Sequence, residues 1–245
     1  MSAAELPPPP RLTPRDAAKA RRTPRQRALS REAIIEAALA IVDTEGLDAL
    51  TMRTVAAALR TGAASLYAYV GSKEELIELV VDRVIGEVRL PDQPDPSRWM
   101  TQLKEVAREM RRVFASHGDL ARATFGRIPL GENALNGAER ILGLVRSGGI
   151  SDRVAAMVVD LLSLYVMGIA YEDSLTAMNA TTADDLTHFI TEMRKYLASL
   201  PAERFPNTVA LAEELTAGDR DERFEFGLEV LLRGLLAISA ERSQA

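Results

Sequence analysis

Residues 50–73, LTMRTVAAALRTGAASLYAYVGSK, constrain the fold of this chain more than any other stretch. Apolar residues at helical spacing predict one short helix over Met52–Leu59 and a second over Ala63–Val70. Gly62 lies between them, where a tight turn often needs a residue that tolerates positive φ. Two helices joined in this way form either an ordinary helical hairpin or a helix-turn-helix, whose second helix enters the major groove of DNA.

The second predicted helix has two different faces. Leu66 and Val70 are expected to point into the protein. The outer side then holds small residues and residues that form hydrogen bonds, namely Ala63, Ala64, Ser65, Tyr67 and Tyr69. Such a surface suits a helix that enters a groove and contacts bases. Spacing alone leaves the ordinary hairpin open.

Two capping residues mark where the preceding helices start. Ser30 is predicted to cap a helix over Arg31–Glu45, which Gly46 then ends. Thr51 is predicted to cap the helix that begins at Met52.

A further helix, after the one over Ala63–Val70, is predicted over 73–88. Ser72, followed three residues later by Glu75, has the spacing of a capping box. Lys73 adds a full positive charge to a helix N-terminus, where unpaired N–H groups already favour an anion. The residues predicted to hold the DNA backbone are Thr51, Arg53 and Lys73.

Motifs over roughly residues 30–85 resemble the DNA-binding domain of the tetracycline-repressor (TetR) family of bacterial transcription regulators. The matching motifs are Thr51-Met52-Arg53, Val55-Ala56, Gly62, Ser65-Leu66-Tyr67 and Lys73-Glu74-Glu75-Leu76. The resemblance implies a recognition helix centred on the Ser-Leu-Tyr segment, with Lys73 on a DNA phosphate. Arg60 departs from the family pattern by standing where Gly is common. Ala68-Tyr69 stands where a bulkier aromatic and a His or Asn are common, so base preference is expected to differ.

The composition favours helices. Of 245 residues, 47% are hydrophobic but only 5% are aromatic, while Ala, Leu and Val are abundant. The absence of cysteine excludes disulfides and thiolate metal sites, and fits a reducing cytosol. Residues 1–31 show no apolar run of a signal peptide. The longest apolar stretch, Val154–Ala170, is interrupted by Asp160 and Ser163 and is short for a membrane span. We therefore predict an all-α cytoplasmic protein.

Charge is distributed unevenly along the chain. The net charge is −5, yet residues 1–31 hold eight basic and two acidic residues, which leaves −11 on the other 214. Residues 1–28 are rich in Pro and Arg and are predicted to be a disordered basic arm. Such an arm meets phosphates, or merely keeps the protein soluble, while the acidic body stays away from DNA.

Prolines in LPDQPDPS, residues 90–97, predict a linker between two domains. The first, residues 29–90, is the predicted helix-turn-helix domain, with the helix-turn-helix itself at about 52–71. The second, residues 97–241, is predicted to bind a ligand and to dimerise. Its expected helices are 97–117, 119–126, 132–147, 152–177, 182–200 and 220–240, with a mixed loop over 201–218.

Helices 152–177 and 220–240 are apolar on nearly every side, which one small domain does not need. We predict that each subunit contributes this pair to a four-helix bundle in a homodimer. Residues 219–229, DRDERFEFGLE, also look like the final helix of the TetR-type ligand-binding domain.

No catalytic constellation, metal-ligand pattern or cofactor motif is visible, and the chain has only two histidines. A small-molecule site between bundle helices is more credible, because such sites are apolar with a few polar groups. The candidates are Met110, Phe114, His117, Phe125, Met157, Tyr165, Met167, Tyr171 and Glu172, with Tyr171 and Glu172 as the favoured polar pair. Each of these positions also suits plain core.

These patterns together predict a homodimeric, ligand-responsive transcriptional repressor on double-stranded DNA. Its two recognition helices would enter successive major grooves, roughly 34–36 Å apart, on a pseudo-palindromic operator. A small-molecule effector would oppose operator binding. One alternative is a helical enzyme or small-molecule-binding protein with an incidental hairpin. Another is a nonspecific DNA-packaging protein, which the acidic body disfavours.

Overall fold

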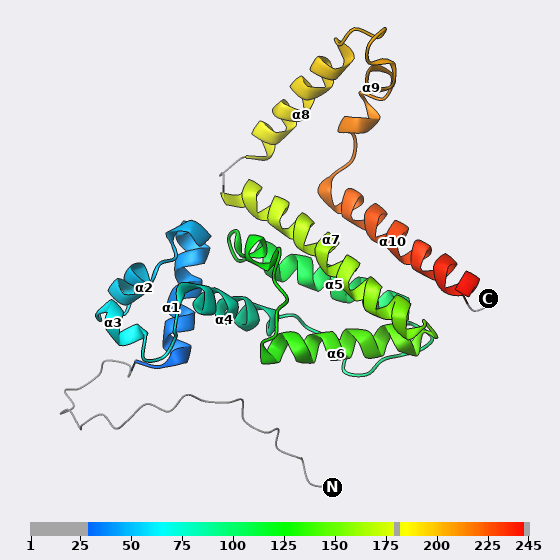
Figure 1. Ribbon diagram of the computed structural model, residues 1–245. Coiled ribbons are helices and arrows are strands. Elements are labelled where there is room, and N and C mark those ends of the chain that lie inside the picture. Colours follow the sequence, from blue (N-terminus) through cyan, green and yellow to red (C-terminus); the bar gives the residue numbers. More distant parts are fainter. Residues whose placement is uncertain (1–28, 179–181, 243–245) are drawn as a thin grey trace, which may run out of the picture.

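The computed structural model describes residues 29–178 and 182–242, and all the regular elements in these ranges are helices (Figure 1). The all-α fold class is therefore confirmed. The predicted basic arm, residues 1–28, lies outside the described residues.

The N-terminal elements are α1 (Arg31–Glu45), η1 (Leu47–Ala49), α2 (Met52–Ala58), α3 (Ala63–Leu66) and α4 (Lys73–Ile85), where η marks a 3₁₀ helix. The predicted cap of α1 is confirmed, because the Ser30 hydroxyl accepts a hydrogen bond from the N–H of Ala33 at 3.1 Å. Gly46 then ends α1 with φ of 83°, a conformation that favours glycine.

Three of these helices are shorter than predicted. α2 ends at Ala58, one residue before the expected Leu59. α3 was expected to reach Val70, but the N–H groups of Tyr69 and Val70 both bond to the carbonyl of Leu66, which closes a turn and leaves one helical turn. α4 ends at Ile85 instead of Val88, because the chain then tightens into bonds between residues three apart.

The C-terminal elements are α5 (Trp99–Ala115), η2 (Leu120–Thr124), α6 (Glu132–Ser147), α7 (Asp152–Met178), α8 (Ala183–Ala198), α9 (Pro206–Ala210), η3 (Glu214–Thr216) and α10 (Arg220–Arg242). The helix expected at 119–126 is the five-residue 3₁₀ helix η2. The loop expected at 201–218 contains α9 and η3. In Figure 1, α5, α6 and α7 form the body, α10 lies along α7, and α8 with α9 stands away from the body.

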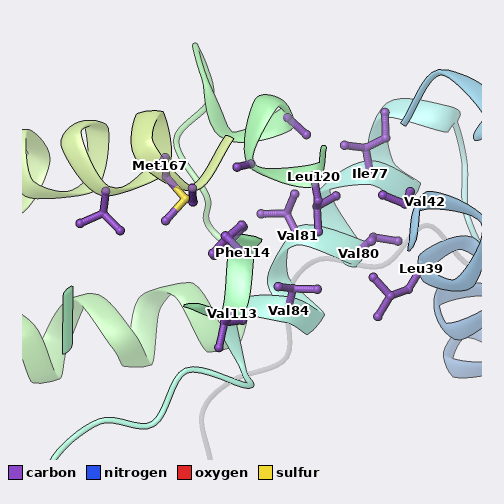
Figure 2. Packing of buried hydrophobic residues seen from close by; sticks show 14 of the residues in the cluster. Leu39, Val42, Ile77, Val80, Val81, Val84, Val113, Phe114, Leu120 and Met167 are labelled. Atoms are coloured by element: carbon purple, nitrogen blue, oxygen red, sulfur yellow. The ribbon is translucent and has the colours of Figure 1, made fainter. Parts of the chain in front are cut away.

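The buried apolar residues form one cluster that extends from α1 through α4 and η2 to α5 and α7. Figure 2 shows this continuity, with Val80 and Val84 of α4 near Leu39 and Val42 of α1, and with Leu120 and Phe114 beyond them. The proline-rich linker thus separates two segments along the chain. α4 belongs to the first segment, and it packs against α1 of that segment and against α5, α6 and η2 of the second.

The turn between α5 and η2 is built into the end of α1. Gly118 has φ of 50°, and a Cβ there would lie 2.5 Å from the carbonyl oxygen of Val42, so a side chain is excluded. The carboxylate of Asp119 accepts a hydrogen bond from the buried N–H of Leu47 at 2.6 Å. Arg122 then joins Asp119 at 3.0 Å and Asp48 at 2.7 Å. We call residues 117–122 the junction turn.

Asp82 joins α4 to the start of α6. Its carboxylate accepts hydrogen bonds from the N–H groups of Ala134 at 2.9 Å and Asn133 at 3.3 Å. Asp82 therefore satisfies N–H groups in the first turn of α6, where an acidic group is favoured. Through the junction turn and Asp82, the position of α4 is tied to α5 and α6.

α7 is the one described helix long and apolar enough to cross a membrane by length and composition, with a mean hydropathy of 1.9 over its most apolar 18 residues. A third of those residues are buried, and core helices pass the same test. α10 carries a comparable exposed apolar face. The large exposed apolar residues of the two helices are Met157, Leu161, Leu164, Leu175, Phe226, Val230, Leu236 and Ile238. A single copy of the chain thus leaves both helices partly uncovered.

Candidate DNA interface and effector region

α2 begins with a network of threonine hydroxyls. The Thr51 hydroxyl accepts from the N–H of Thr54 at 3.0 Å, and the Thr54 hydroxyl accepts from the N–H of Thr51 at 2.9 Å. This reciprocal capping box confirms Thr51 as the cap of α2. The hydroxyl and the backbone N–H of Thr51 are both used in this capping box, so Thr51 fixes where α2 starts. Arg53, in the first turn, is exposed.

α3 and the turn after it, residues 63–70, have the two faces that the sequence predicted. Leu66 and Val70 are fully buried against the core. Ala64, Ser65, Tyr67 and Tyr69 are exposed, with 53% of Tyr67 accessible, and Ala63 is half-buried. Tyr67 and Tyr69 therefore present their rings and hydroxyl groups to solvent on the same side as Ser65.

The start of α4 differs from the prediction in one respect. The Ser72 hydroxyl accepts from the N–H of Glu75 at 3.1 Å, as expected. The Glu75 carboxylate, however, returns to the N–H of Gly71 at 2.7 Å and also pairs with Arg31 at 3.1 Å. This carboxylate already uses part of the local positive potential at the start of α4. Within the described chain, Lys73 forms no ion pair.

The charge of this region stands out against the acidic body. Residues 49–73 contain no Asp or Glu, and their three charged residues are Arg53, Arg60 and Lys73. The face built by α2, the turn and α3 is therefore positive and carries exposed hydroxyl groups. That combination suits phosphates and base edges.

The nine candidate effector residues do not gather in one place. Phe114 and Met167 are buried core residues (Figure 2). Met110 is half-buried against the same core. Met157 lies on the exposed apolar face of α7. For these four, packing or a helix–helix contact explains the apolar side chain without a ligand.

Four other candidates lie along α7 and its neighbours. Phe125 lies edge-on to Tyr171, with ring centroids 6.4 Å apart. Tyr165 stacks on Phe224 at 5.7 Å, and its hydroxyl donates to the carbonyl of Phe224 at 2.9 Å. Burial raises the pKa of Tyr165. Glu172, the favoured polar partner of Tyr171, instead pairs with Arg223 of α10.

His117 lies in the junction turn and apart from the other candidates. Its Nδ1 is 3.0 Å from Asp43 of α1, and its Nε2 is 3.1 Å from Glu87, which follows α4. Carboxylates only accept hydrogen bonds, so the imidazole lies between two acceptors and joins the end of α1 to the segment after α4. Burial raises the pKa of Glu87, but hydrogen bonds from His117 and Arg83 outweigh it and hold the pKa below its usual range.

Sequence reasoning missed a row of ion pairs between α5 and α10. Arg108 makes two hydrogen bonds to Glu225 at 2.6 and 2.7 Å, and Lys104 pairs with Glu229. Arg111 pairs with Asp221 at 2.8 Å and also with Asp173 of α7 at 2.6 Å. The sequence contains a pattern that indicates these ion pairs. Basic residues at 104, 108 and 111 lie on one face of one helix, and acidic residues at 221, 225 and 229 lie on one face of another.

A cavity of about 310 Å³ lies between α4 and the loop over 123–131. Its lining includes Ile77, Leu79 and Ile128 with Arg31 and Arg127, and none of the nine candidate effector residues. Among the described residues, no group of three or more His, Cys, Asp or Glu is arranged to hold a metal ion.

Known proteins resemble this chain over most of its length. The family described as "Bacterial regulatory proteins, tetR family" matches residues 34–80, and "Tetracyclin repressor-like, C-terminal domain" matches residues 90–238. The HTH-type transcriptional repressor DrrR1 of Streptomyces coeruleorubidus is 34% identical over 219 residues, which cover 87% of this chain and 80% of DrrR1.

Solved structures agree with this assignment. The crystal structure of apo ActR from Streptomyces coelicolor is 46% identical, with a TM-score of 0.79, and the match covers 89% of this chain and all of ActR. The complex of ActR with actinorhodin matches with a TM-score of 0.80 at the same identity and coverage. With both family descriptions, a known repressor and these structures in agreement, the chain belongs to the TetR family of bacterial regulatory proteins.

Proposed function

We propose that this protein is a ligand-responsive transcriptional repressor that binds a pseudo-palindromic operator as a homodimer. The observation that carries the proposal is the segment 49–73, which contains no Asp or Glu and exposes Ser65, Tyr67 and Tyr69 while Leu66 and Val70 are buried. In this arrangement α3 lies in the major groove, and Arg53 and Lys73 hold the backbone on either side.

Dimerisation is assigned to α7 and α10. Their exposed apolar residues lie on two helices that pack against each other, so a second copy is able to cover both in a four-helix bundle. Covering this surface removes the exposed apolar area that a single copy leaves, which favours association. The dimer in turn fixes the separation of the two α3 helices.

For the effector, we propose actinorhodin or a compound related to it, since actinorhodin is bound by ActR. The region of α5, α7 and α10 offers aromatic rings at Tyr165 and Tyr171 and a polar group at Glu172. These three residues lie on α7, whose Asp173 pairs with Arg111 of α5 and whose Glu172 pairs with Arg223 of α10. An effector that separates or rotates those helices would act on α4 through the junction turn and Asp82, and would thereby oppose DNA binding.

The proposal assigns a separate function to each of the two segments of the chain. Residues 29–90 serve DNA binding and residues 97–241 serve effector binding and dimerisation, with α4 packed against both. Members of this family are transcriptional regulators, and we propose no catalytic role for this chain. The proposed site of action is operator DNA in the cytoplasm.

The test uses the purified full chain and a fluorescent duplex selected by that protein from a random library. Anisotropy titrations across several salt concentrations should give a linear fall of log K with log salt, together with a large preference for the selected duplex. Adding actinorhodin should release the DNA. A protein that selects no duplex, or binds every duplex equally, would contradict the repressor assignment, whereas binding that actinorhodin leaves unchanged contradicts only the effector assignment.

A further inference from the structure

Arg60 closes α2 in a conformation that its residue type disfavours. The N–H of Arg60 bonds to the carbonyl of Ala57 at 3.0 Å, and the N–H of Thr61 bonds to the carbonyl of Ala56 at 2.9 Å. This pair of bonds is the Schellman motif, which places the residue after the helix end in the left-handed region. Glycine usually fills that position, because it has no Cβ to clash there.

In this chain the position holds arginine, with φ of 52°. Arg60 is the only residue other than glycine with positive φ in the ranges that the structure describes. Its side chain is exposed and makes neither a hydrogen bond nor an ion pair with the described residues. The backbone conformation closes α2, but the arginine side chain adds no pairing within the described chain, and backbone strain of this kind is concentrated at functional sites.

Arg60 lies close in the chain to α3, the helix that is proposed to enter the major groove. It lies three residues before Ala63, the first residue of α3, and the N-terminal residues of such a helix contact base edges in the groove. The sugar–phosphate backbone of the DNA lies next to those bases, at the edge of the groove. No acidic residue lies between 49 and 73 to neutralise the guanidinium, and Gly62 adds no side chain between it and α3.

We propose that Arg60 contacts a phosphate at the edge of the groove that α3 enters, and so positions α3 on the operator. The proposal rests on the proposed function, since it assigns a further residue to the same DNA-binding surface. A guanidinium is a strong hydrogen-bond partner for phosphate oxygens. The strain is then retained because glycine would remove the charge.

A purely structural role predicts something else. A cation after the last turn of α2 interacts favourably with the helix dipole, which would affect stability but not DNA binding. The two roles are separated by measuring thermal stability and operator binding on the same variants. Arg60→Gly removes both the charge and the strain, Arg60→Gln removes the charge alone, and Arg60→Lys keeps the charge.

The experiment titrates the selected operator duplex with each dimeric variant at several salt concentrations. Removing one phosphate contact from each subunit should lower the slope of log K against log salt by about 1.8 per dimer. Arg60→Gln should bind roughly 5- to 30-fold more weakly, as expected when two charge-assisted hydrogen bonds are removed. Arg60→Lys should keep the wild-type slope. Arg60→Gly should bind as weakly as Arg60→Gln and yet melt at a higher temperature than the wild type.

Arg153→Gln is the matched control, because Arg153 is an exposed arginine without an ion pair in the described chain, at the start of α7 and far from α3 (Figure 1). It should leave the salt slope unchanged. An Arg60→Gln variant with the wild-type slope and affinity would overturn the proposal, as would a changed base preference, which would mean a base contact. Wild-type protein without salt-dependent operator binding would instead refute the proposed function itself.

Discussion

Asp119 offers a sharp test of how the two halves of the chain are joined. It is buried in the junction turn and accepts a hydrogen bond from the N–H of Leu47, 72 residues earlier, at 2.6 Å. In Asp119→Ala that buried N–H has no partner, which costs about 1–3 kcal/mol. The ion pair with Arg122 is also removed, but Arg122 is 36% exposed and keeps Asp48, so this second effect adds little.

The expected decrease in unfolding free energy for Asp119→Ala is therefore about 1–3 kcal/mol, or roughly 2–12 °C in Tm for a chain of this size. Urea unfolding at fixed protein concentration measures it, since dimer stability depends on concentration. Asp119→Asn keeps an oxygen for the N–H of Leu47 and should lower the unfolding free energy by about half as much.

Asp48→Asn provides the matched control. Asp48 binds the same Arg122, but its side chain is 89% exposed, so this substitution should change the unfolding free energy by less than about 1 kcal/mol. If Asp119→Ala and Asp48→Asn proved equally mild, the buried hydrogen bond would not be holding the junction turn against α1.

Three further predictions concern separate parts of the molecule. Lys73→Ala should weaken binding to all duplexes about equally and lower the salt slope by about 0.9 for each phosphate that Lys73 no longer neutralises, and an altered base preference in anisotropy titrations would refute that role. Gly148→Ala should destabilise the protein by about 1–3 kcal/mol in urea, because its Cβ would lie 2.5 Å from the ring nitrogen of Trp99. Gly143→Ala, which enters open space on α6, should be neutral or stabilising by up to about 1 kcal/mol. The hydrogen bond from Arg108 lowers the pKa of Glu225 below its ordinary 4.5, so this pair stabilises the fold above that pH and the contribution is lost as the pH falls below it. Arg108→Gln should flatten that decline when urea unfolding is compared at about pH 6 and pH 4, and an unchanged pH profile would contradict the pairing.

Local sequence patterns determined most of the helices. Capping residues and glycines predicted the bounds of α1 and α6 correctly, and Ser30 and Thr51 were correctly identified as caps. These features depend on bonds between residues three or four apart, which the sequence displays directly. For the same reason, the inward and outward sides of α3 were correctly predicted from Leu66 and Val70.

The roles of the candidate effector residues were not determined in this way. His117 and Phe114 lie three residues apart, yet one joins two carboxylates at the junction turn and the other lies in the core. Residue type and periodicity are the same for a core position and for a ligand pocket, so neither distinguishes them. No local pattern places Asp43 beside His117, because 74 residues separate them.

By itself, then, the sequence determined an all-helical chain, the two faces of α3 and the positive surface around it, because each follows from neighbours along one helix or from composition. Only the tertiary structure decided that α4 is packed against both halves of the chain, that the junction turn is built into α1, and that α5 and α10 are joined by ion pairs. The polar contacts among those elements join residues 44 to 125 positions apart, and their partners are selected by packing and burial in three dimensions.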